Sequence, residues 1–145
     1  MMKLLKICSL AAAMALFLAM APTAQAHDDA YLDTVAAPHG GQLRMTGSFH
    51  YELVLVKDSK NAKDNAIEVY VTDHGGTKIP TAGATGTVTL LAGKTKVVSA
   101  LKPDGDNLLT GHASYASTPD MKAVVSIMMA GQAPLQARFT PLAPR

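Results

Sequence analysis

Apolar and polar residues alternate with a period of two along much of the chain between residues 39 and 145. This alternation is typical of β-strands that bury one face. The clearest run places Phe49, Tyr51, Leu53 and Leu55 on one face, opposite residues that are polar at first and apolar later. The pattern predicts strands at 49–56, 67–73, 86–91, 96–101, 108–113, 122–129 and 135–139, and it shows a short alternation at 43–45.

Turn-forming residues separate these runs at intervals of about 8–12 residues, a spacing typical of sandwiches. Two glycines follow His74, for example, and a polar segment at 57–65 is expected to be a loop. No helical periodicity competes with the strand pattern after residue 38. The sequence therefore predicts an all-β protein, an immunoglobulin-like β-sandwich of about seven strands.

The N-terminal residues have a different character. Lys3 and Lys6 precede an apolar run at 10–21, and small residues then lead to Ala26. These features are typical of a secretory signal peptide cleaved after Ala26. The expected segments are a signal peptide at 1–26, a flexible arm at 27–38 and the sandwich at 39–145. The apolar run is shorter than the roughly 20 residues that a membrane span needs, so we expect a periplasmic mature chain without a span.

Charge and cysteine content then exclude several classes of function. Cleavage would leave 119 residues with 11 basic and 11 acidic side chains, and Cys8 would leave with the leader. A net charge of zero argues against nucleic acid or an anionic membrane as the main partner. A mature chain without cysteine has no disulfide, thiolate nucleophile or cysteine metal site. We expect no enzyme, because no nucleophile elbow, phosphate loop or HExxH motif occurs.

The five histidines all follow the predicted cleavage site, and imidazole is a common metal ligand at neutral pH. A hairpin closing at 46–48 would place Met45 opposite Phe49 or His50. Antiparallel pairing with the next strand would then bring His50 near Asp73, with His74 in the following turn. The sequence therefore predicts a metal site with the candidate ligands His50, His74, Asp73 and Met45.

Two further histidines are candidate ligands in other arrangements. A simple meander places His39 near Leu55, so His39 joins His50 only if its segment folds back. Cleavage after Ala26 would make His27 the first residue, where its α-amine and imidazole together can chelate copper. Histidine with methionine and carboxylate suits copper, whereas histidine with carboxylate alone suits zinc, cobalt or nickel. The alternative interpretation is that these are surface histidines without a ligand.

Four segments in order carry a resemblance to a known family. They lie at 38–41 (PHGG), at 51–54 directly after His50, at 69–73 and at 85–91. Their order resembles the small periplasmic PHGG domain associated with the adaptor proteins of RND-type heavy-metal efflux pumps, of the cobalt–zinc–cadmium and copper–silver kind. The resemblance covers residues 38–101 and extends towards 139. It implies a metal-binding or metal-resistance role, with His39 and His50 as ligands and a metal efflux system as partner.

The chain also departs from that family, because pump adaptors carry a long helical hairpin and a lipoyl-type domain. Neither is present here, so the resemblance implies a free-standing metal buffer or a carrier to a pump. The expected function is therefore periplasmic binding of a divalent transition metal ion or copper. The competing hypothesis is a β-sandwich interaction module that binds no metal and presents its loops to a partner.

Overall fold

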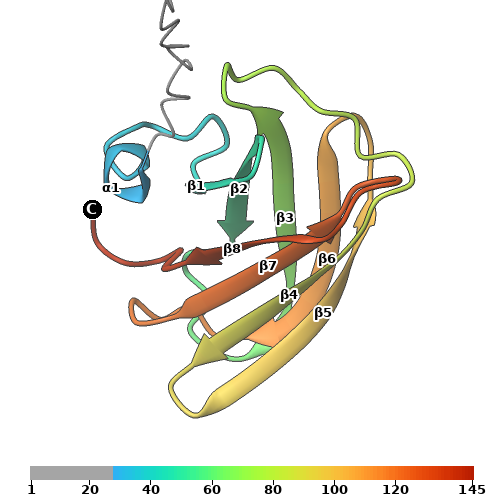
Figure 1. Cartoon of the computed structure of the whole chain (residues 1–145). Coiled ribbons are helices and arrows are strands. Elements are labelled where there is room, and N and C mark those ends of the chain that lie inside the picture. The colour runs from blue at the N-terminus through green and yellow to red at the C-terminus, as the bar shows by residue number, and fades with distance from the viewer. Residues whose placement is uncertain (1–27) are drawn as a thin grey trace, which may run out of the picture.

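A computed structural model describes residues 28–145, and the predicted signal peptide and His27 lie outside this range. Within it, one short helix accompanies eight strands (Figure 1). The elements are α1 (Asp29–Leu32), β1 (Gln42–Thr46), β2 (Phe49–Leu55), β3 (Lys63–Asp73), β4 (Thr85–Ala92), β5 (Thr95–Pro103), β6 (Leu108–Tyr115), β7 (Lys122–Met128) and β8 (Leu135–Phe139). Within these residues, no helix has the length and apolar character needed to cross a bilayer.

The strands form one antiparallel sheet in the order β1-β2-β3-β6-β5-β4-β7-β8. Strand β5 connects its two halves, because residues 95–101 pair with β4 whereas Lys102 and Pro103 pair with β6. The sheet therefore curves into two facing layers and nearly closes into a barrel (Figure 1). This confirms the all-β, sandwich-like prediction, with eight strands where about seven were expected.

The first and last strands of the sheet meet along a seam. No backbone ladder joins β1 to β8 in the part of the chain that the structure describes, but side chains connect them. The Thr46 hydroxyl donates to the Gln136 carbonyl oxygen at 2.9 Å, and the Thr140 amide donates to Gln42 Oε1 at 2.8 Å. The curvature of the sheet is thus completed by side-chain hydrogen bonds.

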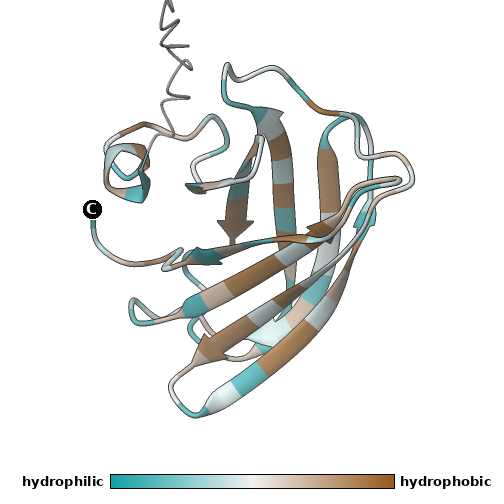
Figure 2. Ribbon diagram, in the orientation of Figure 1, coloured by the Kyte–Doolittle hydropathy of each residue, from teal (hydrophilic) through white to brown (hydrophobic). Residues whose placement is uncertain are grey.

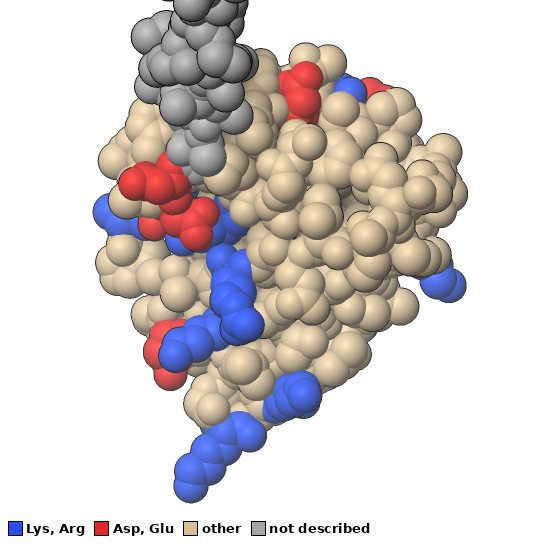
Figure 3. Space-filling view, viewed as in Figure 1, with Lys and Arg blue, Asp and Glu red and all other residues tan. Residues whose placement is uncertain are grey.

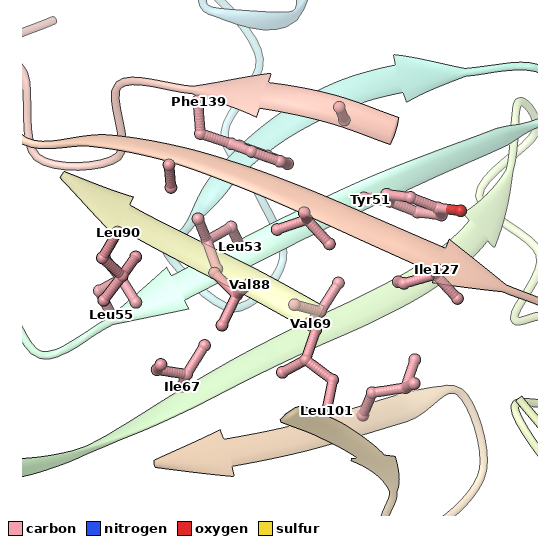
Figure 4. Packing of buried hydrophobic residues seen from close by; sticks show 14 of the residues in the cluster. Tyr51, Leu53, Leu55, Ile67, Val69, Val88, Leu90, Leu101, Ile127 and Phe139 are labelled. Atoms are coloured by element: carbon pink, nitrogen blue, oxygen red, sulfur yellow. The ribbon is translucent and has the colours of Figure 1, made fainter. Parts of the chain in front are cut away.

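The core lies between the two layers and is made by the inward-facing residues of the alternating strands. Apolar and polar bands alternate along the strands in Figure 2, and Figure 4 shows the inward side chains meeting between the layers. Burying a side chain of this size contributes about 1.5–3 kcal/mol relative to leaving it in water. Fully buried members include Tyr51, Leu53, Ile67, Val69, Val88, Leu101 and Ile127.

Strand β3 begins four residues earlier than the alternation predicts, at Lys63 instead of residue 67. Its polar start pairs with β6, where Lys63 lies opposite Tyr115. Asn65 is buried there, and its side-chain amide donates to Ser59 Oγ at 2.8 Å and to the Tyr115 carbonyl oxygen at 2.7 Å. The segment is polar because hydrogen bonds, rather than apolar contacts, hold it in the sheet.

The arm, predicted to be a flexible segment at 27–38, makes defined contacts in its described residues. Its described residues contain α1, where the Asp28 side chain accepts a hydrogen bond from the Tyr31 amide at 2.8 Å. Leu32 is buried, and Asp33 binds Arg44 of β1 at 2.8 Å. The arm therefore packs against the sheet, through a helix too short to produce a recognisable periodicity.

Candidate functional site

A cavity of about 280 Å³ lies between the arm and the outer face of β1, β2 and β3. The arm supplies an apolar wall that includes Tyr31, Leu32 and Val35. The opposite wall is polar, and it brings together three of the histidines considered in the sequence. Its chemically active side chains are His39, His50, Glu52, Tyr70 and His74.

Strand β2 presents two polar side chains to this cavity. His50 and Glu52 alternate with the core residues Tyr51 and Leu53, so they point away from the core. They are nevertheless only 7% and 3% exposed. Because the arm covers this part of the sheet, two side chains on an outer face become nearly as buried as the core.

The Glu52 carboxylate holds the segment at His39 against β2. Its Oε1 accepts hydrogen bonds from the amides of His39 at 2.8 Å and Gly41 at 3.0 Å. Its Oε2 lies 2.8 Å from His39 Nδ1. A carboxylate only accepts hydrogen bonds, so Nδ1 carries the proton and Nε2 of the neutral ring keeps its lone pair. Glu52 therefore sets the tautomer of His39 that leaves Nε2 able to bind a metal ion.

This contact corrects the position expected for His39. A simple meander places it near Leu55, but the structure places it beside Glu52, in the same cavity as His50. The segment folds back because three hydrogen bonds to one buried carboxylate outweigh the extended continuation of β1. The structure therefore shows the alternative in which the segment folds back, and not the simple meander.

The two glycines after His39 make this fold-back sterically feasible. Gly40 has a φ of 73°, in the left-handed region that favours glycine. A Cβ atom at Gly41 would lie 2.4 Å from the carbonyl oxygen of Leu53, so the two backbones pass too closely for any side chain. The His-Gly-Gly motif thus has a structural purpose, which is to bring the His39 backbone within reach of Glu52.

Tyr70 of β3 fixes the ring of His39 from its face. The two rings stack with centroids 3.5 Å apart and planes 3° apart. The Tyr70 hydroxyl donates to Glu68 Oε2 at 2.9 Å. Burial, followed by this hydrogen bond, raises the pKa of Tyr70 to about 12, so the hydroxyl stays protonated at neutral pH. His39 is therefore held by Glu52 in its plane and by Tyr70 across its face.

His50 and His74 form a second pair of rings in the cavity. Their centroids are 4.9 Å apart with planes 24° apart. The lone pair of an imidazole nitrogen lies in the ring plane, so two nearly parallel rings do not direct lone pairs at one ion. Accordingly, no three His, Asp or Glu side chains within residues 28–145 are placed to hold an ion in this conformation. His74 is exposed on a turn, whereas His50 is buried on a strand.

The strand register confirms one predicted neighbour of His50 and corrects another. Met45 lies directly opposite His50, as one of the two expected registers has it. The partner of His50 on β3 is Thr72, whereas Asp73 lies opposite Phe49. A slip of one residue reverses the face of a side chain, so Asp73 points away from His50.

Asp73 instead shapes the turn that carries His74. Its Oδ1 accepts the amides of Gly75 and Thr77, both at 2.8 Å. These hydrogen bonds, with the Thr77 amide as the largest cause, lower the pKa of Asp73. The carboxylate is therefore engaged by its own turn, and it is not among the residues that line the cavity.

The sequence pointed to only part of this site. Glu52 lies two residues from His50 on the same strand face, and that spacing was the available signal for it. Tyr70 and the apolar arm had no such signal, because neither carries a metal-ligand pattern. Met45, although opposite His50, does not line the cavity. His27 lies outside the described residues.

The comparisons with known proteins add no relative to this description. No protein-family model matches the chain, and no curated protein matches it significantly. The interpretation of the site therefore depends on its own geometry and chemistry.

Proposed function

We propose that the protein binds a divalent transition metal ion or copper in this cavity and serves in heavy-metal handling or resistance in the periplasm. The observation that carries the proposal is that His39, His50 and His74, from three separate segments, line one cavity. Three imidazoles are a ligand set that suits zinc, copper, cobalt and nickel.

Each histidine has a distinct part in the proposed coordination. His39 offers Nε2, because Glu52 holds its Nδ1, and a carboxylate behind a ligating histidine is a common arrangement in metal sites. His50 is buried on a strand and provides a rigid ligand. His74 completes the set after its ring rotates out of the stack with His50.

Met45 bears on which ion is bound. Residues directly opposite each other in an antiparallel pair have Cβ atoms about 5 Å apart. Met45 is therefore close to His50, although it does not line the cavity, and it would have to change rotamer to reach an ion there. A thioether favours copper in its reduced state, whereas the imidazoles alone suit zinc, cobalt or nickel. Participation of Met45 would therefore distinguish copper from the other ions.

The cellular role in the proposal comes from the sequence. The leader at 1–26 supports export to the periplasm. The resemblance to the PHGG domain of efflux adaptors supports a partnership with a metal efflux system, as a buffer or carrier.

Calorimetric titration tests the proposal. The protein is recovered after export, its N-terminus is read by mass spectrometry, and it is titrated with Cu(II), Zn(II), Co(II) and Ni(II), and with Cu(I) under reducing conditions. We expect one site of micromolar or tighter affinity for at least one ion. His50→Ala should weaken binding at least about tenfold, since each lost ligand removes one coordinate bond. Acidification to about pH 5 should weaken it too, because protonated imidazole cannot coordinate.

The matched control is His112→Ala, which removes an exposed histidine of β6 from outside the cavity. It should leave the affinity unchanged. Copper binding lost only in His27→Ala would place the site at the N-terminus and contradict the cavity site. Absence of binding for every ion at pH 7.5 would reject metal binding and leave the non-metal interaction module as the better hypothesis.

A further inference from the structure

The charges of the protein are unevenly distributed over its two layers. Strands β4, β5, β7 and β8 contain no acidic residue, and every charged residue in them is basic. Lys94 adds another cation in the turn between β4 and β5. Residues 28–145 have equal numbers of basic and acidic side chains, but these four strands form a basic surface. The cations of these strands are Lys96, Lys102, Lys122 and Arg138.

The strand register gathers these cations on one outer surface. Leu91 of β4 lies opposite Lys96 on one side and Lys122 on the other. Arg138 lies opposite Val124, which projects from the same face of β7 as Lys122. Figure 3 shows basic side chains following one another over this part of the molecule, with acidic side chains at one edge and a wide uncharged area at the other. Asp29 of the arm is one acidic residue at that edge, because it lines a pocket together with Lys122 and Arg138. We call the outward-facing side chains of β4, β5, β7 and β8 the basic face.

The basic face also carries exposed apolar side chains. Four large hydrophobic residues are exposed within residues 28–145, and three of them, Leu91, Val98 and Met128, belong to these strands. Val98 is 58% exposed and Leu91 is 37% exposed. A surface that combines cations with exposed apolar side chains can bind an anionic lipid bilayer, whose headgroups are charged and whose interior is apolar.

Other occupants fit this face less well. A second copy in a two-fold arrangement would bring like charges together. Protein interfaces are enriched in aromatic residues and depleted in lysine, whereas the outward positions of these strands hold lysines and no aromatic residue. A fluid anionic surface requires no shape complementarity, so dispersed cations suffice.

We infer that the basic face binds the surface of an anionic lipid bilayer. In this binding mode the lysine ammonium groups contact the lipid phosphates, while the exposed Leu91 and Val98 enter the headgroup region. The histidine cavity lies between the arm and β1, β2 and β3. These strands belong to the layer opposite the basic face (Figure 1). Membrane binding is thus independent of the proposed metal site.

Flotation with lipid vesicles tests the inference. The exported protein, without metal, is mixed with vesicles of phosphatidylcholine alone or with half phosphatidylglycerol. We expect it to float only with the anionic vesicles and to be released by about 0.5 M salt, which shortens the screening length. Replacing Lys96, Lys122 and Arg138 with glutamine should lower the partition coefficient about 100-fold, at about fivefold for each cation.

A matched control removes three exposed lysines from elsewhere, by substitution of Lys57, Lys60 and Lys63 with glutamine. It changes the net charge equally and should reduce the partition coefficient at most severalfold. Leu91→Thr with Val98→Thr tests the apolar part and should weaken binding while the fold, followed by circular dichroism, stays unchanged. Equal losses in the two lysine variants, or no flotation with anionic vesicles at low salt, would overturn the inference. Capture by an acidic polypeptide without flotation would assign the face to a protein partner instead.

Discussion

The outward-facing side chains of β2 and β5 follow the same alternation but have opposite environments. His50 and Glu52 of β2 are 7% and 3% exposed, whereas Val98 of β5 is 58% exposed. The arm covers β2, and no described segment covers that part of β5. Strand periodicity thus shows which side chains leave the core, but whether water reaches them depends on a segment that has no strand pattern.

Whether a face is covered by the arm also determines the chemistry that it can perform. On the covered face one carboxylate makes three defined contacts, and an imidazole is held both in its plane and across its face. On the bare face the cations have no fixed acidic partner within their own strands. The first arrangement suits selective coordination, and the second suits an extended electrostatic surface.

Among the changes that test this comparison, removal of the Glu52 carboxylate should lower the stability of the protein most. Glu52→Ala leaves the amides of His39 and Gly41 without their acceptor in a covered site. We expect a loss of about 3 kcal/mol in the free energy of unfolding, because each unsatisfied buried donor costs about 1–3 kcal/mol. Urea denaturation measures the change.

Glu68→Ala is the matched control for this substitution. Glu68 lies on the neighbouring strand, and its carboxylate accepts a hydrogen bond from the Tyr70 hydroxyl. Removal of the Glu68 carboxylate should lower the free energy of unfolding by less than about 1 kcal/mol. Equal losses in the two variants would show that Glu52 does not hold the segment at His39 in solution.

Two leucines compare the covered face with the bare one directly. Leu32 of the arm is 2% exposed, whereas Leu91 of β4 is 37% exposed. Leu32→Ala should lower the free energy of unfolding by about 2 kcal/mol. This is at the lower end of the usual loss for a buried leucine, because the arm lies at the periphery of the protein. Leu91→Ala should stay within about 0.5 kcal/mol. Denaturation gives both values, and faster proteolysis within 28–38 in Leu32→Ala alone would assign the loss to the arm.

The smallest expected effect concerns the ion pair of Asp33 with Arg44, which holds the arm against β1. The hydrogen bond from Arg44, followed by that from Gln42, holds the pKa of Asp33 below its ordinary value. The folded protein therefore releases this proton more readily than the unfolded chain. The stabilisation is complete above the ordinary carboxyl pKa near 4, and it is lost as the pH falls through the lowered value.

Asp33→Asn should remove this pH dependence. Because the Asp33 side chain is 38% exposed, solvent screens the pair and the loss at pH 7 should be about 0.5–1 kcal/mol. The difference in stability between the wild type and Asp33→Asn should shrink as the pH is lowered from 6 to 3. A constant difference over that range would show that Asp33 and Arg44 are not paired in solution.

Much of the fold could be predicted from the sequence because alternation and turn residues report directly on strands. Strand β8 (Leu135–Phe139) has the expected bounds, and the hairpin of β4 and β5 closes at the expected turn. The polar start of β3 could not be predicted, since side-chain amide bonds such as those of Asn65 leave no periodic pattern. The four residues of α1 are likewise too few to form one.

The candidate site could be predicted in its residue types but not in its arrangement. His50 opposite Met45 follows from hairpin geometry. The position of Asp73 could not be predicted because a shift of one residue in the strand register moves its side chain to the other face. The position of His39 could not be predicted because Glu52 draws its segment back against β2. Local pattern therefore identified the imidazoles, whereas the contacts that bring them together are made between segments.

The seam between β1 and β8 has a consequence for the order of folding. Gln42 and Thr140 meet across 98 residues of chain, so this closure must wait for the last strand to be synthesised. The residues that line the cavity all lie between 31 and 76, and Glu52 reaches back only 13 residues to His39. Contacts of short sequence separation form faster than those of long separation. We therefore expect the histidine cavity to form early and closure of the sheet to be the later, long-range event.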